Sequence, residues 1–223
     1  MRCRTEKNHK MQIAPRCLSV MAAMFLASLC HSFELNVVVL DQDGTPVTDA
    51  VIEINQRPLQ SPPAHNAVID QVDRRFVPMV IAVAEGQSVE FLNSDNVRHH
   101  VYSFSEIRQF STELFADEAI DPVQFNRAGI AVLGCNIHDS MVAYVYVSGW
   151  QDIAVTDKTG KLTFAGLPDK PGAISIWHPW MDAPDNRMEV SVAHLDTGDN
   201  ITVALPLVRP DQAFGFRALS RDP

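Results

Sequence analysis

The stretch Gly134-Cys135-Asn136-Ile137-His138-Asp139-Ser140-Met141 places a thiol, an imidazole and a thioether three residues apart. A thiolate, an imidazole and a weakly held thioether are the ligand types of a blue-copper electron-transfer site, which needs one more imidazole. His99-His100 lies upstream, shortly after an apolar run that is typical of a strand. The sequence therefore predicts a copper site built from two separate loops.

A structural role is the alternative for each of these residues taken singly, because lone Cys, Met and His residues usually pack or hydrogen-bond within the core. Their common spacing, preceded by a His pair, favours a metal site. Zinc is the main competing metal, but its structural sites usually show four Cys or His ligands, often with a second C-x2-C pair. Met is a poor zinc ligand, so ligand softness favours copper.

The first 32 residues have the pattern of a secretory signal peptide. A basic segment precedes an apolar run of fourteen residues, 17–30, and small residues occupy positions −3 and −1 of a cleavage site before Phe33. The run is too short to span a bilayer comfortably. Met11 is an alternative start, and Cys30 is an alternative lipoprotein anchor, although the residue before it is larger than an anchor requires. The sequence predicts export to the periplasm.

Removal of residues 1–32 leaves an acidic chain with a single thiol. Of the 18 Lys and Arg and 27 Asp and Glu residues, 13 and 26 remain, a net charge of −13. An acidic surface argues against nucleic acid or an anionic membrane as partner, and suits either a partner with a basic docking face or simple solvation. The remaining thiol, Cys135, is exposed to oxidation in an exported protein, and metal ligation is a physical reason to keep it.

The mature residues predict an all-β protein. Helical periodicity is scarce, and short runs of β-branched residues are broken by Gly, Pro, Asp and Asn, which is typical of a sandwich or barrel. The length suits one large or two small domains. Residues 33–59 are expected to form two strands around an Asp-Gly turn, and 60–67 a loop at a domain boundary.

A longer pattern covers residues 68–148. It runs F-x-P-x2-I-x-V-x2-G-x2-V-x-F-x-N, with a His six residues after the Asn and C-x2-H-x2-M further on. This pattern resembles the cupredoxins, the family of plastocyanin and amicyanin, and two shorter runs resemble the plastocyanin-like methylamine utilisation proteins. The resemblance implies a Greek-key β-sandwich with one mononuclear type 1 copper. The positions that match are Phe76, Pro78, Ile81, Val83, Gly86, Val89, Phe91, Asn93, His99, Gly129, Cys135, His138 and Met141.

Two residues compete for the role of upstream ligand. The family pattern selects His99, which falls six residues after Asn93. The next residue is commonly Asn in cupredoxins, but here it is His100. His100 either replaces that Asn as a hydrogen-bond linker or is itself the ligand. The spacing favours His99, as does the fact that neighbouring strand residues face opposite ways. The predicted metal ligands are therefore His99, Cys135, His138 and Met141, with His100 as the alternative to His99.

The flanks resemble a different module. The pattern V-x-D-x2-G-x-P-V-x2-A-V at 39–51 resembles the first half of a transthyretin-like or carboxypeptidase regulatory-like sandwich. Residues 149–210 resemble its second half. We therefore expect a discontinuous domain, 33–67 plus 149–210, interrupted by the copper domain at 68–148 and followed by a tail at 211–223. His178 and His194 are interpreted as structural or exposed, without a metal.

The predicted function is a one-electron carrier and not an enzyme. The protein itself would fill all four copper positions, and neither paired carboxylates nor a nucleophile–base pair is visible. The family resemblance implies a periplasmic redox partner such as a dehydrogenase or a cytochrome. Two alternatives stay open. One is copper binding or delivery without electron transfer, and the other is an interaction protein whose sandwich binds a partner or sugar while the copper is structural.

Overall fold

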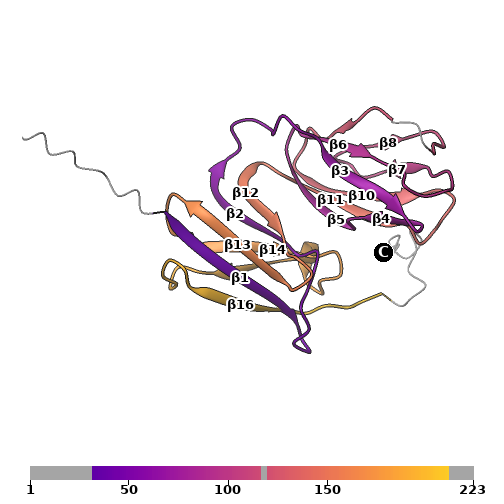
Figure 1. The fold of residues 1–223 in the computed structure, drawn as a ribbon. Coiled ribbons are helices and arrows are strands. Elements are labelled where there is room, and N and C mark those ends of the chain that lie inside the picture. The colour runs from indigo at the N-terminus through magenta and orange to yellow at the C-terminus, as the bar shows by residue number, and fades with distance from the viewer. Residues whose placement is uncertain (1–31, 117–119, 211–223) are drawn as a thin grey trace, which may run out of the picture. The chain divides into compact units, whose positions relative to one another are not determined.

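The computed structural model describes residues 32–116 and 120–210 (Figure 1). Strands dominate these residues, with one 3-10 turn at Pro184–Asn186, so the predicted all-β fold is confirmed. Residues 1–31, which hold most of the predicted signal peptide with Met11 and Cys30, lie outside the described residues, as does the predicted tail at 211–223. Among the described residues, no helix has the length and hydropathy needed to cross a membrane.

Two sheets enclose the region that carries the predicted ligands. One has the strand order β5-β11-β10-β7-β8, and the other has the order β4-β3-β6-β9. Their apolar faces share one core, which includes Cys135 and Met141. The first sheet contains β5 (Val80–Ala84), β7 (Val101–Ser103), β8 (Phe110–Ser111), β10 (Gly129–Cys135) and β11 (Val142–Ser148), and the second contains β3 (Ala67–Val72), β4 (Arg75–Val77), β6 (Ser88–Phe91) and β9 (Val123–Gln124).

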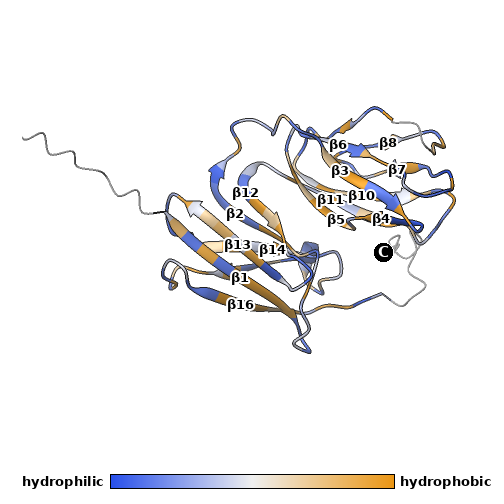
Figure 2. Cartoon of the chain, viewed as in Figure 1, coloured by the Kyte–Doolittle hydropathy of each residue, from blue (hydrophilic) through white to orange (hydrophobic). Residues whose placement is uncertain are grey.

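Strands from both flanks build two further sheets, with orders β13-β1-β16 and β12-β2-β14-β15. β1 (Phe33–Asp41) alternates buried and more exposed residues, and Figure 2 shows the matching stripes of hydropathy. It pairs antiparallel with β13 (Lys161–Leu167) and parallel with β16 (Asn200–Leu205). The other sheet contains β2 (Val51–Pro58), β12 (Trp150–Val155), β14 (Ala173–Trp177) and β15 (Arg187–Ser191). The domain boundaries and the regulatory-like resemblance stay predictions.

A third apolar cluster joins the two pairs of sheets. On β11, Tyr144 and Tyr146 point away from the ligand-bearing core and pack with Trp177 of β14 and with Val51 and Val80. Each tyrosine ring lies 5.7 Å from the Trp177 ring, measured between centroids. Burial raises the pKa of both tyrosines to about 12. The sheet that carries Cys135 is therefore covered on its outer face by strands from the flanks.

Candidate metal centre

Cys135 and His138 are positioned by the end of β10 and the tight loop that follows it. Gly134 and Cys135 pair with Tyr102 and Val101 of β7, which fixes the thiol at the end of the strand. The amide of Met141 donates to the carbonyl of His138 over 2.9 Å, and the amide of Cys135 donates to the carbonyl of Met141 over 3.3 Å. The loop thus folds back on itself and brings the imidazole of His138 over the thiol.

His99 enters from the loop before β7, not from a strand. It forms an isolated antiparallel bridge with Phe115, with both N–O distances 3.0 Å. The side-chain amide of Asn93 donates to the carbonyls of Val97 and Phe115, each over 3.0 Å. These bonds hold the loop in place, and they leave His99 fully buried.

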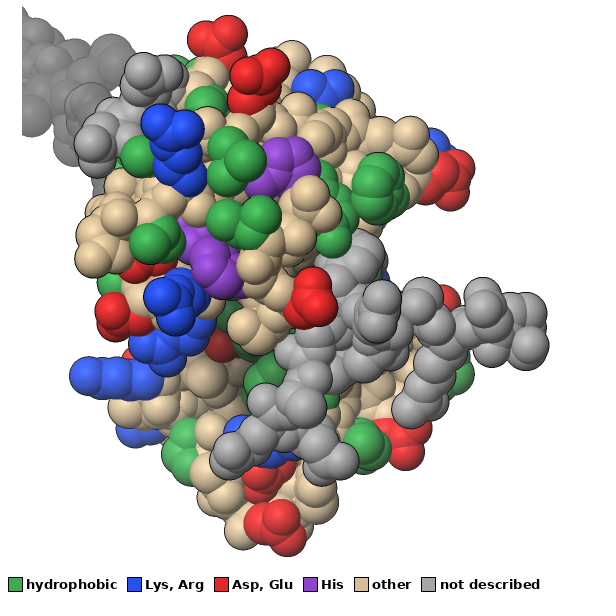
Figure 3. All heavy atoms as spheres, turned by 90° about the vertical axis from the view of Figure 1, so that its right-hand side faces the viewer, with side chains coloured by type: hydrophobic (Ala, Val, Ile, Leu, Met, Phe, Trp, Pro, Cys, Tyr) green, Lys and Arg blue, Asp and Glu red, His purple; other side chains and the backbone are tan. Residues whose placement is uncertain are grey.

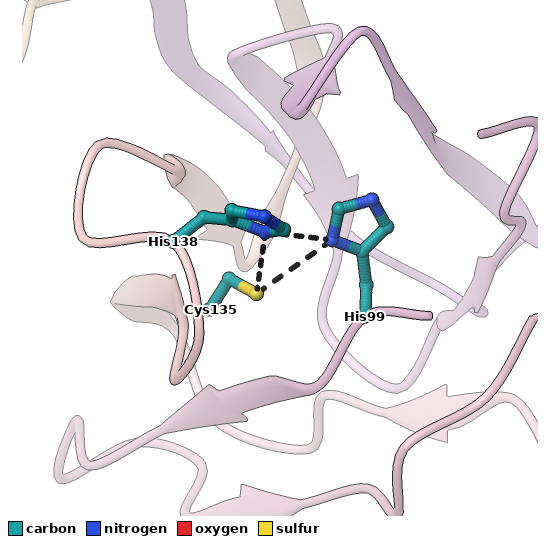
Figure 4. Close-up of side chains that lie close together, drawn as sticks. All are labelled: His99, Cys135 and His138. Carbon is teal, nitrogen blue, oxygen red and sulfur yellow. Dashed lines mark hydrogen bonds between the residues drawn. The ribbon is translucent and has the colours of Figure 1, made fainter. Parts of the chain in front are cut away.

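The three side chains form a compact triangle of donor atoms (Figure 4). The Sγ of Cys135 lies 3.8 Å from Nδ1 of His99 and 3.9 Å from Nδ1 of His138. The two Nδ1 atoms are 3.2 Å apart. Two loops distant in sequence therefore bring one sulfur and two nitrogens within reach of a single ion.

The edges of this triangle test which metal would fit. With bonds of about 2.0 Å to nitrogen and about 2.3 Å to sulfur, a tetrahedral ion separates N from S by about 3.5 Å and N from N by about 3.3 Å. The observed N–N edge is close to this value, but both N–S edges are longer. With the three observed edges, an ion at these bond lengths from all three donor atoms would lie in about the plane of those atoms. The donor set fits the trigonal His2Cys arrangement of copper better than tetrahedral zinc.

Asp95 binds the far side of the His99 ring and was missed by the sequence analysis. Its Oδ2 lies 2.7 Å from Nε2 of His99. Burial raises the pKa of Asp95, but hydrogen bonds from the Arg74 amide, the His99 ring and the Asp73 amide outweigh it, so the pKa lies below its ordinary value. An ionised carboxylate only accepts hydrogen bonds, so Nε2 of His99 is the donor in this contact, and Nδ1 faces the thiol of Cys135.

The second imidazole differs in its surroundings. His138 is half-buried, whereas His99 and Cys135 are fully buried. Burial lowers the pKa of His138, and the nearby His99 and Arg74 lower it further, although Asp95 opposes them. A lowered pKa keeps the imidazole neutral at neutral pH, which is the form that binds a metal.

The two remaining candidates lie in different places. Met141 is 1% exposed and belongs to the same apolar cluster as Cys135. The Nε2 of His100 lies 3.0 Å from the hydroxyl of Ser111, and its ring lies 5.8 Å from that of Tyr102, on the outer side of β7. The structure places His99, and not His100, next to Cys135. The assignment of Met141 as an axial ligand stays a prediction.

The chain is similar to several solved cupredoxin structures. Amicyanin from Paracoccus versutus (Thiobacillus versutus) is 20% identical, with 44% of this chain and 97% of amicyanin covered and a TM-score of 0.35. A purple cupredoxin from Nitrosopumilus maritimus is 22% identical, covering 37% and 100%, with a TM-score of 0.33. A Cu-containing nitrite reductase from Thermus scotoductus SA-01 is 23% identical, covering 50% and 28%, with a TM-score of 0.36.

These structural neighbours are amicyanin and other cupredoxins, the family that residues 68–148 resemble in sequence. No model of a protein family matches the chain, and no curated protein matches it. At these TM-scores the likeness carries no argument for ligands or function, which rest on the donor geometry.

Proposed function

We propose that this protein binds one copper ion and exchanges single electrons with a redox protein. The observation that carries the proposal is the triangle of Cys135 Sγ and the Nδ1 atoms of His99 and His138. When bound there, copper supplies the one-electron step by alternating between its two common oxidation states. We further propose that Met141 is the weak axial ligand and that the bound copper is of the type 1 class.

The residues around the triangle favour electron transfer over substrate chemistry. Cys135 and His99 are 2% and 0% exposed, so water is kept from the donors. The bridge to Phe115 and the Asn93 hydrogen bonds hold the His99 loop in one geometry. A rigid, closed site changes its charge with little rearrangement, and it offers no open position to a substrate. An electron carrier that is not an enzyme is the function that suits this arrangement best.

His138 is the part of the triangle that lies nearest solvent, and it provides the route by which electrons would enter and leave. The residue before it, Ile137, is 47% exposed, and Phe104 near the end of β7 is 71% exposed. Figure 3 shows one face of the molecule, on which histidine side chains lie among hydrophobic ones. A redox partner such as a dehydrogenase or a cytochrome would dock there, and the signal-peptide pattern in residues 1–32 supports a periplasmic location.

The test is the visible spectrum of the full chain loaded with Cu(II). A thiolate ligand gives an intense charge-transfer band, so we expect a strongly coloured protein that is bleached reversibly by a mild reductant. Cys135→Ser should abolish the band, whereas His178→Gln, a change of another buried histidine, should leave it intact. A colourless protein that binds Cu(I) and releases it readily would instead support copper delivery. A band that survives in Cys135→Ser would refute the proposed site.

A further inference from the structure

The carboxylate of Asp95 is fixed by the chain itself, before any ligand is considered. Its Oδ1 accepts the amide of Asp73 over 2.7 Å, and its Oδ2 accepts the amide of Arg74 over 2.9 Å. The amide of Asp95 donates to Oδ1 of Asn93 over 3.1 Å. The side chain is only 11% exposed. Asp95 is therefore a pre-positioned charge, not a mobile surface carboxylate.

The turn that clamps Asp95 has an unusual backbone. Asp73 and Arg74 connect β3 to β4 with φ values of 51° and 57°, in the left-handed region that few non-glycine residues adopt. In this conformation the two successive amides both point at the Asp95 side chain. The β3–β4 turn and His99 thus contact the same carboxylate.

The two imidazoles of the triangle differ in their contact with Asp95. It contacts Nε2 of His99 at 2.7 Å. In the described part of the chain, no group hydrogen-bonds to Nε2 of His138. A carboxylate behind a ligand imidazole fixes its tautomer and makes its other nitrogen a stronger donor. Among the described residues, a carboxylate supports the ring of His99 but not that of His138.

We infer that Asp95, held by the Asp73–Arg74 turn, is a positioning residue that orients His99 in the metal-free protein and lowers the reduction potential of the copper site. The second part rests on the proposed function, whereas the first concerns the apo protein alone. A negative charge behind the ligand favours the metal state of higher charge, Cu(II), over Cu(I). Because the side chain is 11% exposed, water and salt screen this effect less than they would for a fully exposed carboxylate.

The experiment compares Asp95→Asn with Asp139→Asn in the full chain. Both variants lose one negative charge close to a predicted ligand. Asp139 directly follows His138, is exposed, and has no hydrogen bond to a ligand imidazole among the described residues. Asp95→Asn should raise the reduction potential more than Asp139→Asn and should weaken copper binding about 10- to 100-fold, as loss of an outer-shell partner does. Equal shifts in the two variants would reduce Asp95 to a simple point charge and overturn the inference.

A second measurement needs no copper. Nitrogen-15 chemical shifts of the metal-free wild-type protein at neutral pH should show His99 with its proton on Nε2 and with Nδ1 bare. Asp95→Asn should give a mixture of tautomers, because its amide cannot accept from His99 and from both turn amides at once. A proton on Nδ1 of wild-type His99 would overturn the inference. If the tautomer is as expected but copper gives no intense band, the proposed function fails while the orienting role of Asp95 stands.

Discussion

The two pairs of sheets, called the ligand-bearing and the flanking sandwich only for their place in the chain, each bury a histidine. The two histidines differ in what their nitrogens contact. His178 in the flanking sandwich is 2% exposed. Its Nδ1 accepts the amide of Trp180 over 3.1 Å, and its ring also hydrogen-bonds to the backbone of Thr48. His99 is as deeply buried, but its Nε2 contacts Asp95, and its Nδ1 faces a thiol and a second imidazole. A buried histidine whose ring hydrogen-bonds only to the backbone has a structural role. A buried histidine with one nitrogen facing a thiol and a second imidazole is a candidate metal ligand.

The largest effect on stability is expected where the two sandwiches meet. Trp177 is 3% exposed and contacts Tyr144 and Tyr146 of the ligand-bearing sheet. Truncating a buried Trp to Ala leaves a cavity and costs about 3–5 kcal/mol. We therefore expect Trp177→Ala to lower the free energy of unfolding in urea by about this amount.

Trp150→Ala is the matched control, because Trp150 is only half-buried and its loss should cost less. If Trp177→Ala splits unfolding into two transitions, the cluster is what makes the sandwiches unfold together. If Trp177→Ala lowers the free energy of unfolding no more than Trp150→Ala does, the two sandwiches are energetically independent. The two buried histidines would then belong to separately stable domains.

Much of the site could be predicted from the sequence, because two of its donors share one loop and the third matches a family pattern. Cys135 and His138 share one loop, so their spacing alone brings them together. His99 needed the family pattern, since only the pairing of β7 with β10 and the bridge to Phe115 bring it to the thiol. The strand there begins at Val101, and His99 lies before it in an isolated bridge.

Other features depend on three-dimensional contacts that spacing does not encode. Asp95 lies four residues before His99, and this spacing was available in the sequence, but the direction of its carboxylate is set by the Asp73–Arg74 turn. The parallel pairing of β1 with β16 joins the two ends of the described chain. The two strands are separated by most of the chain, and no local sequence pattern indicates which distant strand will pair with β1.

A smaller effect, also in the flanking sandwich, is expected on the pH dependence of stability. Burial lowers the pKa of His178 from 6.5 to about 4, with Thr48 opposing and Arg209 adding to the shift. Above pH 6.5 the ring is neutral in both states, so it has no effect. Below pH 6.5 the unfolded chain takes up a proton that the folded chain does not, and stability falls until about pH 4. The total loss should be about 3 kcal/mol.

Urea unfolding at several pH values between 4 and 7 measures this loss. His178→Gln should flatten the pH dependence in that window, whereas His194→Gln should leave it unchanged because His194 is exposed. An unchanged slope in His178→Gln would show that His178 is protonated in the folded protein, and its contrast with His99 would then be wrong.

The smallest effect on stability is expected for a pair of methionine changes, one in the ligand-bearing sandwich and one in the flanking sandwich. Met141 lies in the core of the ligand-bearing sandwich and Met181 in that of the flanking one, and they are 1% and 2% exposed. Met→Leu nearly conserves volume, so each variant should lose less than about 1.5 kcal/mol. Only Met141→Leu should shift the reduction potential, because a weak axial thioether tunes the copper while the equatorial thiolate and imidazoles keep the band. Protein-film voltammetry of both variants makes the comparison. Equal potentials in Met141→Leu, Met181→Leu and wild type would remove Met141 from the ligand set and leave a three-coordinate site of His99, Cys135 and His138.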